Sequence, residues 1–291
     1  MTENLTTTIS SKSQSVAISR ANPTVIIGER INPTGRKKLQ KTLVDGDFSM
    51  VRSDALAQVE AGAAILDVNA GVPGADEAAL MKQLMAEVAS VVDVPLCIDT
   101  ADPDALAAAL EVYEGKALVN SVNGEERSLD AVLPIVKEHD AAVIGLCMDD
   151  NGIPATPEER LTVADKIVER AAKLGIPLED LVIDPLALTM GADHNAGRVA
   201  LETIELIVEK YGVNITMGAS NISFGMPDRP YINATFIAMA VHAGLTCPIT
   251  NPLEELVAIS IKAADLSMGF DEYGANWIKA YRSREKAKAE S

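Results

Sequence analysis

The chain has 291 residues with 42 acidic and 25 basic side chains, so its formal net charge at pH 7 is -17. Nucleic-acid binding needs a basic surface against the phosphates, and this balance argues against a nucleic-acid partner. The apolar runs fall short of the roughly 18 residues that cross a bilayer, so we expect no membrane partner, and the length fits two ordinary domains or one large barrel.

From residue 24 onward, short β-rich apolar runs alternate with longer stretches of helical periodicity, which predicts parallel strands joined by helices. The predicted strands are Thr24–Gly28, Ala64–Val68, Pro95–Asp99, Ala117–Asn120, Ala142–Leu146, Leu181–Asp184, Asn214–Gly218 and Cys247–Thr250. The predicted helices are Met50–Glu60, Glu77–Val91, Pro103–Val112, Leu129–His139, Pro157–Lys173, Val199–Tyr211, Tyr231–His242 and Glu254–Leu266.

Eight such units without a linker rich in Pro, Gly or Ser favour a single (β/α)8 TIM barrel over two domains, with a doubly wound sheet as the rival. No G-x-G-x-x-G follows the first strand, so nothing supports dinucleotide binding. We expect residues 1–22 to form a flexible N-terminal tail or a short arm that closes the barrel, residues 23–282 the barrel, and residues 283–291 a charged C-terminal tail.

Three cysteines, Cys97, Cys147 and Cys247, lie far apart and form no C-x-x-C pair. This spacing argues against a disulfide framework or a structural zinc site and suits a reducing, cytoplasmic location.

Most of the predicted strands end in a carboxylate or a carboxamide. These residues are Glu29, Asp67 with Asn69, Asp99, Asn120 with Asn123, Asp149, Asp184, Asn221 and Asn251. Asp and Asn often follow strands simply because they cap the next helix or support a turn, and Asp149 fits that interpretation. Asp99 and Asp184, however, belong to the apolar strands themselves, and the reactive groups of a parallel α/β barrel gather at this end.

A ring of carboxylates and amides suits a nitrogen-rich heterocycle better than a metal ion, since amides are poor ligands for metals other than Ca²⁺. His139 and His242 are predicted at helix ends, where a cation meets the negative end of the dipole. His194 is the one histidine near the predicted active face, and its role stays open. We therefore predict no bound metal.

The strings at the strand ends, taken in order, resemble the pterin-binding methyltransferases. They are GERINPTG (28–35), LDVN (66–69), CIDT (97–100), VNS (119–121), IDPL (183–186) and GASNISF (218–224). That family includes methyltetrahydrofolate:corrinoid methyltransferases and the folate domain of cobalamin-dependent methionine synthase. The resemblance runs from about residue 24 to about residue 281.

The resemblance implies a dihydropteroate-synthase-like TIM barrel that moves a methyl group between N5 of tetrahydrofolate and a corrinoid (cobalamin) on a partner protein. The implied catalytic residues are Asn221 beside N5 and Asp99 as a proton relay. The implied residues for binding pterin or folate are Asp67, Asn69, Asp99, Asn120, Asp184, Gly218, Ser220, Asn221 and Arg229. Tetrahydrofolate and 5-methyltetrahydrofolate are the implied co-substrates of this one-carbon reaction, and a homodimer is implied by analogy.

Two alternatives stay open. A dihydropteroate synthase-like enzyme would show N-x-T-P-D-S-F after the first strand and S-R-K after the seventh, where this chain has INPTG and SNISF. A non-catalytic folate-binding barrel would bind pterin without methyl transfer. Because folate is itself an anion, we further expect basic side chains near the site, with Arg36, Lys37, Lys38, Arg198 and Arg229 as the candidates.

Overall fold

Eight parallel strands close into a barrel in the computed structural model, which describes the backbone of residues 4–290 and the side chains of residues 4–286. The order around the barrel is β10-β3-β4-β5-β6-β7-β8-β9. The strands are β3 (Ile27–Ile31), β4 (Ile65–Asn69), β5 (Leu96–Asp99), β6 (Leu118–Asn123), β7 (Ala142–Leu146), β8 (Leu181–Asp184), β9 (Asn214–Gly218) and β10 (Cys247–Thr250). The predicted (β/α)8 barrel is confirmed.

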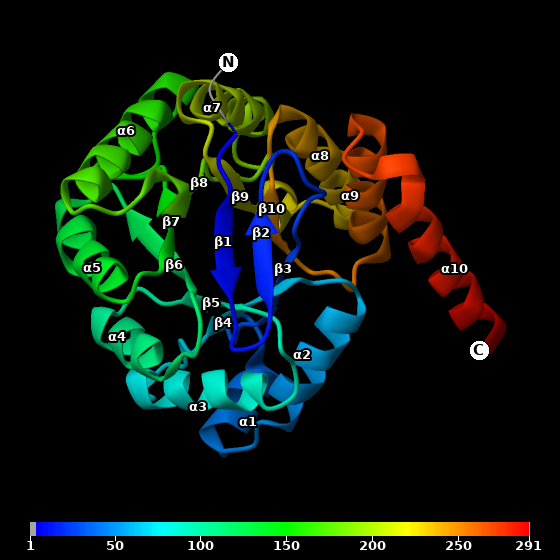
Figure 1. Ribbon diagram of the computed structural model, residues 1–291, viewed down its shortest axis with the longest axis horizontal. Coiled ribbons are helices and arrows are strands. Elements are labelled where there is room, and N and C mark those ends of the chain that lie inside the picture. The colour runs from blue at the N-terminus through cyan, green and yellow to red at the C-terminus, as the bar shows by residue number, and fades with distance from the viewer. Residues whose placement is uncertain (1–3, 291) are drawn as a thin grey trace.

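Helices ring the barrel, as Figure 1 shows. They are α1 (Lys37–Val44), α2 (Ser49–Glu60), α3 (Glu77–Ala89), α4 (Pro103–Val112), α5 (Glu126–Glu138), α6 (Pro157–Lys173), α7 (Ala196–Tyr211), α8 (Arg229–Ala243), α9 (Glu255–Met268) and α10 (Ala275–Glu290). Local caps set several starts: the Asp102 carboxylate accepts from Asp104 N, and Thr156 with Glu159 forms a capping box on α6. Within the described residues, no helix is long and apolar enough to cross a membrane.

The first barrel strand starts three residues later than the sequence predicts. Thr24 donates through both its amide and its hydroxyl to the buried carboxylate of Asp265, so the chain is held by α9 before ladder pairing begins at Ile27. Glu29 consequently lies inside β3 instead of just after it.

An antiparallel hairpin of β1 (Thr7–Ser10) and β2 (Ser15–Ile18) occupies much of the segment expected to be a tail or a closing arm. It lies across the centre of the ring of helices in Figure 1. Ile9 and Ile18 are fully buried against the inward-facing apolar residues of the barrel. The Asn214 side chain at the start of β9 donates to the carbonyl of Ile18 and the hydroxyl of Thr7, which anchors both strands of the hairpin.

At the other end of the chain, α10 extends away from the ring of helices in Figure 1. The segment 283–290, expected as part of a charged tail, belongs to this helix, and residue 291 lies outside the described residues. Neither α10 nor the short α1 was among the predicted helices. The boundaries proposed for the three regions stay a prediction.

Side chains along each strand face alternately the helices and the barrel interior, and this alternation decides which residues reach the site. In β5, Leu96 and Ile98 pack outward on the helix layer, whereas Cys97 joins the barrel interior and Asp99 follows on that same inward face. Ile65, Leu118 and Val182 are the matching inward apolar residues of their strands. A polar layer therefore lies directly above an apolar one at the carboxyl ends of the strands.

Candidate active site

Three of the predicted site residues share one level of the barrel. The register pairs Asn69 with Asp99 and Asp99 with Asn120 across β4, β5 and β6. The Asn69 amide donates to the Asp99 carboxylate over 2.9 Å. The strand ends thus bring an acceptor and two carboxamides together, a set that matches the hydrogen-bonding edge of a heterocycle.

Asp67 lies two residues deeper along β4, level with Cys97, and is only 2% exposed. Burial raises its pKa well above the usual range, and the nearby charge of Asp99 raises it further. Asn120 donates to Asp67 over 3.1 Å. Burial also raises the pKa of Asp99, while a hydrogen bond from Asp67 opposes that rise. Burial and mutual repulsion therefore favour a proton retained by this pair of carboxyl groups.

Asp184 ends β8 and is 5% exposed. Its Oδ1 accepts from the backbone amide of Leu186 over 2.7 Å. Burial raises the pKa of Asp184 to about 7, against the opposing effects of the amides of Leu186 and Gly218 and of the Arg160 charge. A carboxylate of this kind changes its charge near neutral pH.

Three more predicted residues, Gly218, Ser220 and Asn221, lie on the short 3-10 helix that follows β9, η2 (Ala219–Ser223), or directly before it. Ser220 donates to the carboxylate of Glu29 over 3.2 Å, and burial raises the pKa of Glu29. A Cβ on Gly218 would come within 2.9 Å of the Asn221 amide nitrogen, so glycine leaves room for that side chain. Asn221 itself is exposed at the barrel mouth.

Arg229 braces this loop. Its guanidinium donates to the carbonyl of Ser220 over 2.8 Å and to the hydroxyl of Ser223 over 3.0 Å. Arg36 is likewise engaged, in an ion pair of 2.7 Å with Asp54. Of the basic residues expected to face folate, Arg36 therefore uses its charge in an ion pair, and Arg229 is held in place by neutral partners.

A cavity of about 390 Å³ opens beside the polar layer. Its lining includes Asp99, Asn120, Asn123, Leu146 and the exposed Arg127 from α5. Asp184, Gly218 and Asn221, from the opposite side of the barrel, are not part of this lining. The cavity thus adjoins one half of the predicted residue set.

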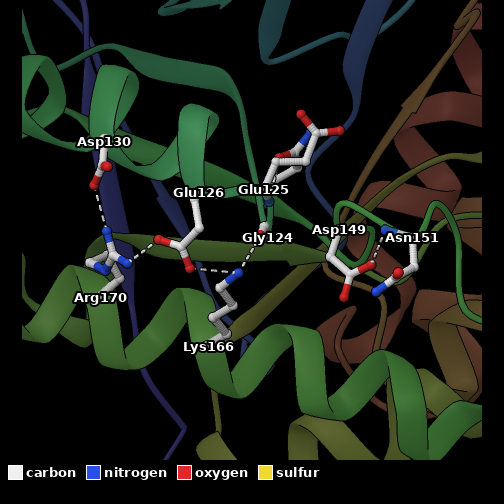
Figure 2. A network of polar contacts seen from close by, with 9 residues as sticks. Gly124, Glu125, Glu126, Asp130, Asp149, Asn151, Lys166 and Arg170 are labelled. Atoms are coloured by element: carbon white, nitrogen blue, oxygen red, sulfur yellow. Dashed lines mark hydrogen bonds and ion pairs between the residues drawn. The ribbon is translucent and has the colours of Figure 1, made fainter.

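Ionic contacts on the outer side hold the cavity wall in place, as Figure 2 shows. Lys166 of α6 donates to the carbonyl of Gly124 over 2.6 Å and pairs with Glu126, and Arg170 pairs with Glu126 and Asp130. A Cβ on Gly124 would meet Val163 at 2.6 Å, so glycine permits the close approach of this loop to α6.

No group of three or more His, Cys, Asp or Glu suited to a metal ion occurs among the described residues. His194 is exposed in the loop after β8, His139 caps the end of α5, and His242 lies in the last turn of α8. The absence of a metal ion from the reaction stays a prediction.

Sequence reasoning missed two arginines, Arg127 on the cavity wall and the buried Arg160 behind Asp184. The signal for Arg127 was its place at the start of the helix that follows VNS. No comparable local signal exists for Arg160, because its importance depends on which loops pack around it.

Comparison with known proteins places these residues in a family context. A family model described as pterin binding enzyme matches residues 28–251. The methylcorrinoid:tetrahydrofolate methyltransferase of Eubacterium limosum is 33% identical over 261 residues, which cover 89% of this chain and 96% of that protein. Methionine synthase of Mycobacterium tuberculosis is 30% identical over 240 residues, 78% of this chain but 20% of that larger protein.

Solved structures show the same fold at lower identity. Dihydropteroate synthase from Xanthomonas albilineans in complex with 7,8-dihydropteroate has a TM-score of 0.70 at 18% identity, covering 90% of this chain and 98% of that one. Dihydropteroate synthase from Thermus thermophilus in complex with 4-aminobenzoate has a TM-score of 0.68 at 18% identity, covering 89% and 99%. At these identities the likeness shows the fold alone.

Proposed function

Because the chain belongs to the pterin binding enzyme family, we propose that it is a methyltransferase acting between N5 of tetrahydrofolate and the cobalt of a corrinoid on a partner protein. The observation that carries this proposal is the likeness, over 96% of its length, to a methylcorrinoid:tetrahydrofolate methyltransferase. The buried polar layer of the barrel supports it, because its donors and acceptors suit a pterin edge.

In this proposal Asp99, Asn120 and Asp184 hold the polar edge of the pterin ring. Asn69 and Asp67 act through hydrogen bonds that orient Asp99 and Asn120. Gly218 and Ser220 form the wall beside N5, and Arg229 keeps their loop in place. Arg127 offers a positive charge on the cavity wall for the glutamate tail of folate.

The chemistry is an exchange of one bond for another. N5 bonds to the methyl carbon as the carbon–cobalt bond breaks with its electron pair left on cobalt, and the reverse reaction needs N5 to be protonated. The Asn221 amide accepts a hydrogen bond from protonated N5 or donates one to its lone pair, which stabilises the changing charge. Asp99 passes the proton between N5 and water, a role that its raised pKa suits.

An absorbance assay with methylcob(III)alamin and tetrahydrofolate tests the proposal. We expect Asn221→Ala to slow methyl transfer by about 100-fold, the usual cost of removing one group that stabilises developing charge. Asn151→Ala, an exposed asparagine in the turn after β7, is the matched control and leaves the rate unchanged. Equal rates for wild type and Asn221→Ala would refute the role of Asn221.

The same assay separates the alternatives. Folate binding by the wild type without any methyl transfer would favour a non-catalytic folate-binding barrel. Formation of 7,8-dihydropteroate in the presence of 4-aminobenzoate would instead favour a dihydropteroate synthase-like enzyme. The loops INPTG (31–35) and SNISF (220–224) give no support to that second activity.

We also infer a homodimer in the cytoplasm. Many exposed large apolar side chains gather between residues 231 and 281, on α8, α9, α10 and their connections: Tyr231, Met239, Leu253, Leu256, Leu266, Met268, Tyr273, Ile278 and Tyr281. Between α7 and α8 lies a groove of about 560 Å³ lined largely by apolar side chains, Leu201, Phe236 and Met239 among them. A second copy would cover this surface.

The three cysteines are buried and unpaired, which suits a reducing compartment such as the cytoplasm.

A further inference from the structure

Arg160 is a buried cation behind the active site. It follows the capping box of Thr156 and Glu159 in the first turn of α6, and it is 1% exposed. A positive charge in the first turn of a helix opposes the helix dipole, and burying a guanidinium costs several kcal/mol of hydration. Its presence there is therefore not explained by the stability of α6.

The hydrogen bonds of Arg160 join two loops at the mouth of the barrel. Its Nε donates to the carbonyl of Pro154, in the loop before α6, over 3.0 Å. Its Nη1 donates to the carbonyls of Pro185 and Leu186, just after β8, over 2.9 and 2.7 Å. These partners are all neutral backbone groups, so the positive charge stays available to act on its surroundings.

Leu186 connects Arg160 to Asp184. Its backbone has a φ of +66°, a left-handed conformation that is unusual and strained for a residue with a branched side chain. In this conformation its N–H donates to the Asp184 carboxylate while its carbonyl accepts from Arg160. Asp184 thus binds the backbone amide of Leu186 while Arg160 binds its backbone carbonyl.

We propose that Arg160 is a positioning residue for Asp184. By holding the carbonyl of Leu186, Arg160 fixes the backbone amide that orients this carboxylate toward the pterin. The proposal rests on the proposed function for the role of Asp184 in pterin binding. Its geometric part, a guanidinium and a carboxylate that hold one backbone residue between them, is independent of any ligand.

Four titratable groups face Asp184 or Arg160. Burial raises the pKa of Asp184 and the Arg160 charge opposes that rise, while burial lowers the pKa of Arg160 and the charge of Asp193 in the following loop is among those that oppose that shift. Burial raises the pKa of the Cys147 thiol above its usual range and that of Cys247 to about 12, so both thiols are neutral between pH 6 and pH 9. Arg160 is therefore the charge whose removal changes the ionisation of Asp184 most directly.

Calorimetric titration with tetrahydrofolate from pH 6 to pH 9 tests this positioning role. Wild-type affinity should rise through about pH 7 as Asp184 ionises. Arg160→Met should move this midpoint upward, so that affinity at pH 7 falls severalfold and recovers at pH 9. Arg160→Lys, which keeps the charge but loses the planar fork, should keep the midpoint and bind more weakly at every pH.

Arg170→Met is the matched control, because Arg170 lies on the same helix and pairs with Glu126 and Asp130 on the outside. Wild-type affinity and midpoint in both Arg160 variants, with only a lower melting temperature, would overturn the proposal. If Arg160→Met fails to fold, full affinity of Arg160→Lys at every pH overturns it alone.

A carbon-13 NMR titration of the Asp184 carboxyl, assigned with Asp184→Asn, reports the midpoint without folate. A wild type that does not bind folate would contradict the proposed function, and the NMR midpoints of wild type and Arg160→Met or Arg160→Lys still decide the role of Arg160. An unchanged midpoint in Arg160→Met refutes the effect on ionisation, whereas a raised one supports it.

Discussion

Asp184 combines deep burial with a role at the mouth of the barrel, and its ionisation should be visible in the stability of the protein. Its pKa is about 7 in the folded chain and near 3.8 when exposed, so the folded state binds the extra proton between these values. The protonated Asp184 therefore stabilises the folded state fully below about pH 4, and this stabilisation is lost as the pH rises to about 7.

We expect the free energy of unfolding to fall more steeply between pH 4 and pH 7 in the wild type than in Asp184→Asn. The difference in slope approaches ~1.4 kcal/mol per pH unit for a single such group. Urea unfolding at several pH values measures it, with Asp193→Asn, an acid of the exposed loop, as control. Parallel curves for wild type and Asp184→Asn would show that Asp184 does not titrate in this range.

At the same scale, the sequence predicts the identity of the polar residues but not their depth. LDVN places Asp67 and Asn69 on one face of a strand, and both are natural candidates for ligand contact. The stagger between β4 and β5 pairs Asp67 with Cys97 and Asn69 with Asp99. Register is a non-local property, so the inner position of Asp67 required the assembled barrel.

Among the elements, the eight strands and their main helices could be predicted because hydrophobic periodicity and helix-capping residues are local signals in the sequence. The hairpin could not be predicted in detail. Its strands TTIS (7–10) and SVAI (15–18) are short, half of their residues are Ser or Thr, and their apolar side chains are buried against the inward-facing residues of the barrel. The helix α10 could not be predicted for a different reason: its charged sequence has no strong apolar stripe, which is the local signal for a helix.

The hairpin should matter for stability and not for the affinity for folate. Ile9→Ala removes a fully buried side chain and should lower the free energy of unfolding by about 2–5 kcal/mol. Thr8→Ala, on the exposed face of the same strand, should change it by less than about 0.5 kcal/mol. Urea unfolding measures both, and a small effect of Ile9→Ala would mean that the hairpin detaches at little cost.

For the whole molecule, the exposed apolar surface over α8 to α10 predicts self-association. Met239→Glu places a charge in the groove between α7 and α8 and should convert a dimer into a 30.8 kDa monomer in light-scattering measurements. Leu56→Glu on α2 is the matched control, since Leu56 and Met239 are both 51% exposed. A monomeric wild type would refute the homodimer.

The hairpin under the barrel also determines how protons travel. With Ile9 and Ile18 filling the floor, the hairpin separates the barrel interior from solvent at the end opposite the polar layer. A proton that Asp99 passes between N5 and water would therefore enter and leave at the mouth, on the side where the pterin ring would lie.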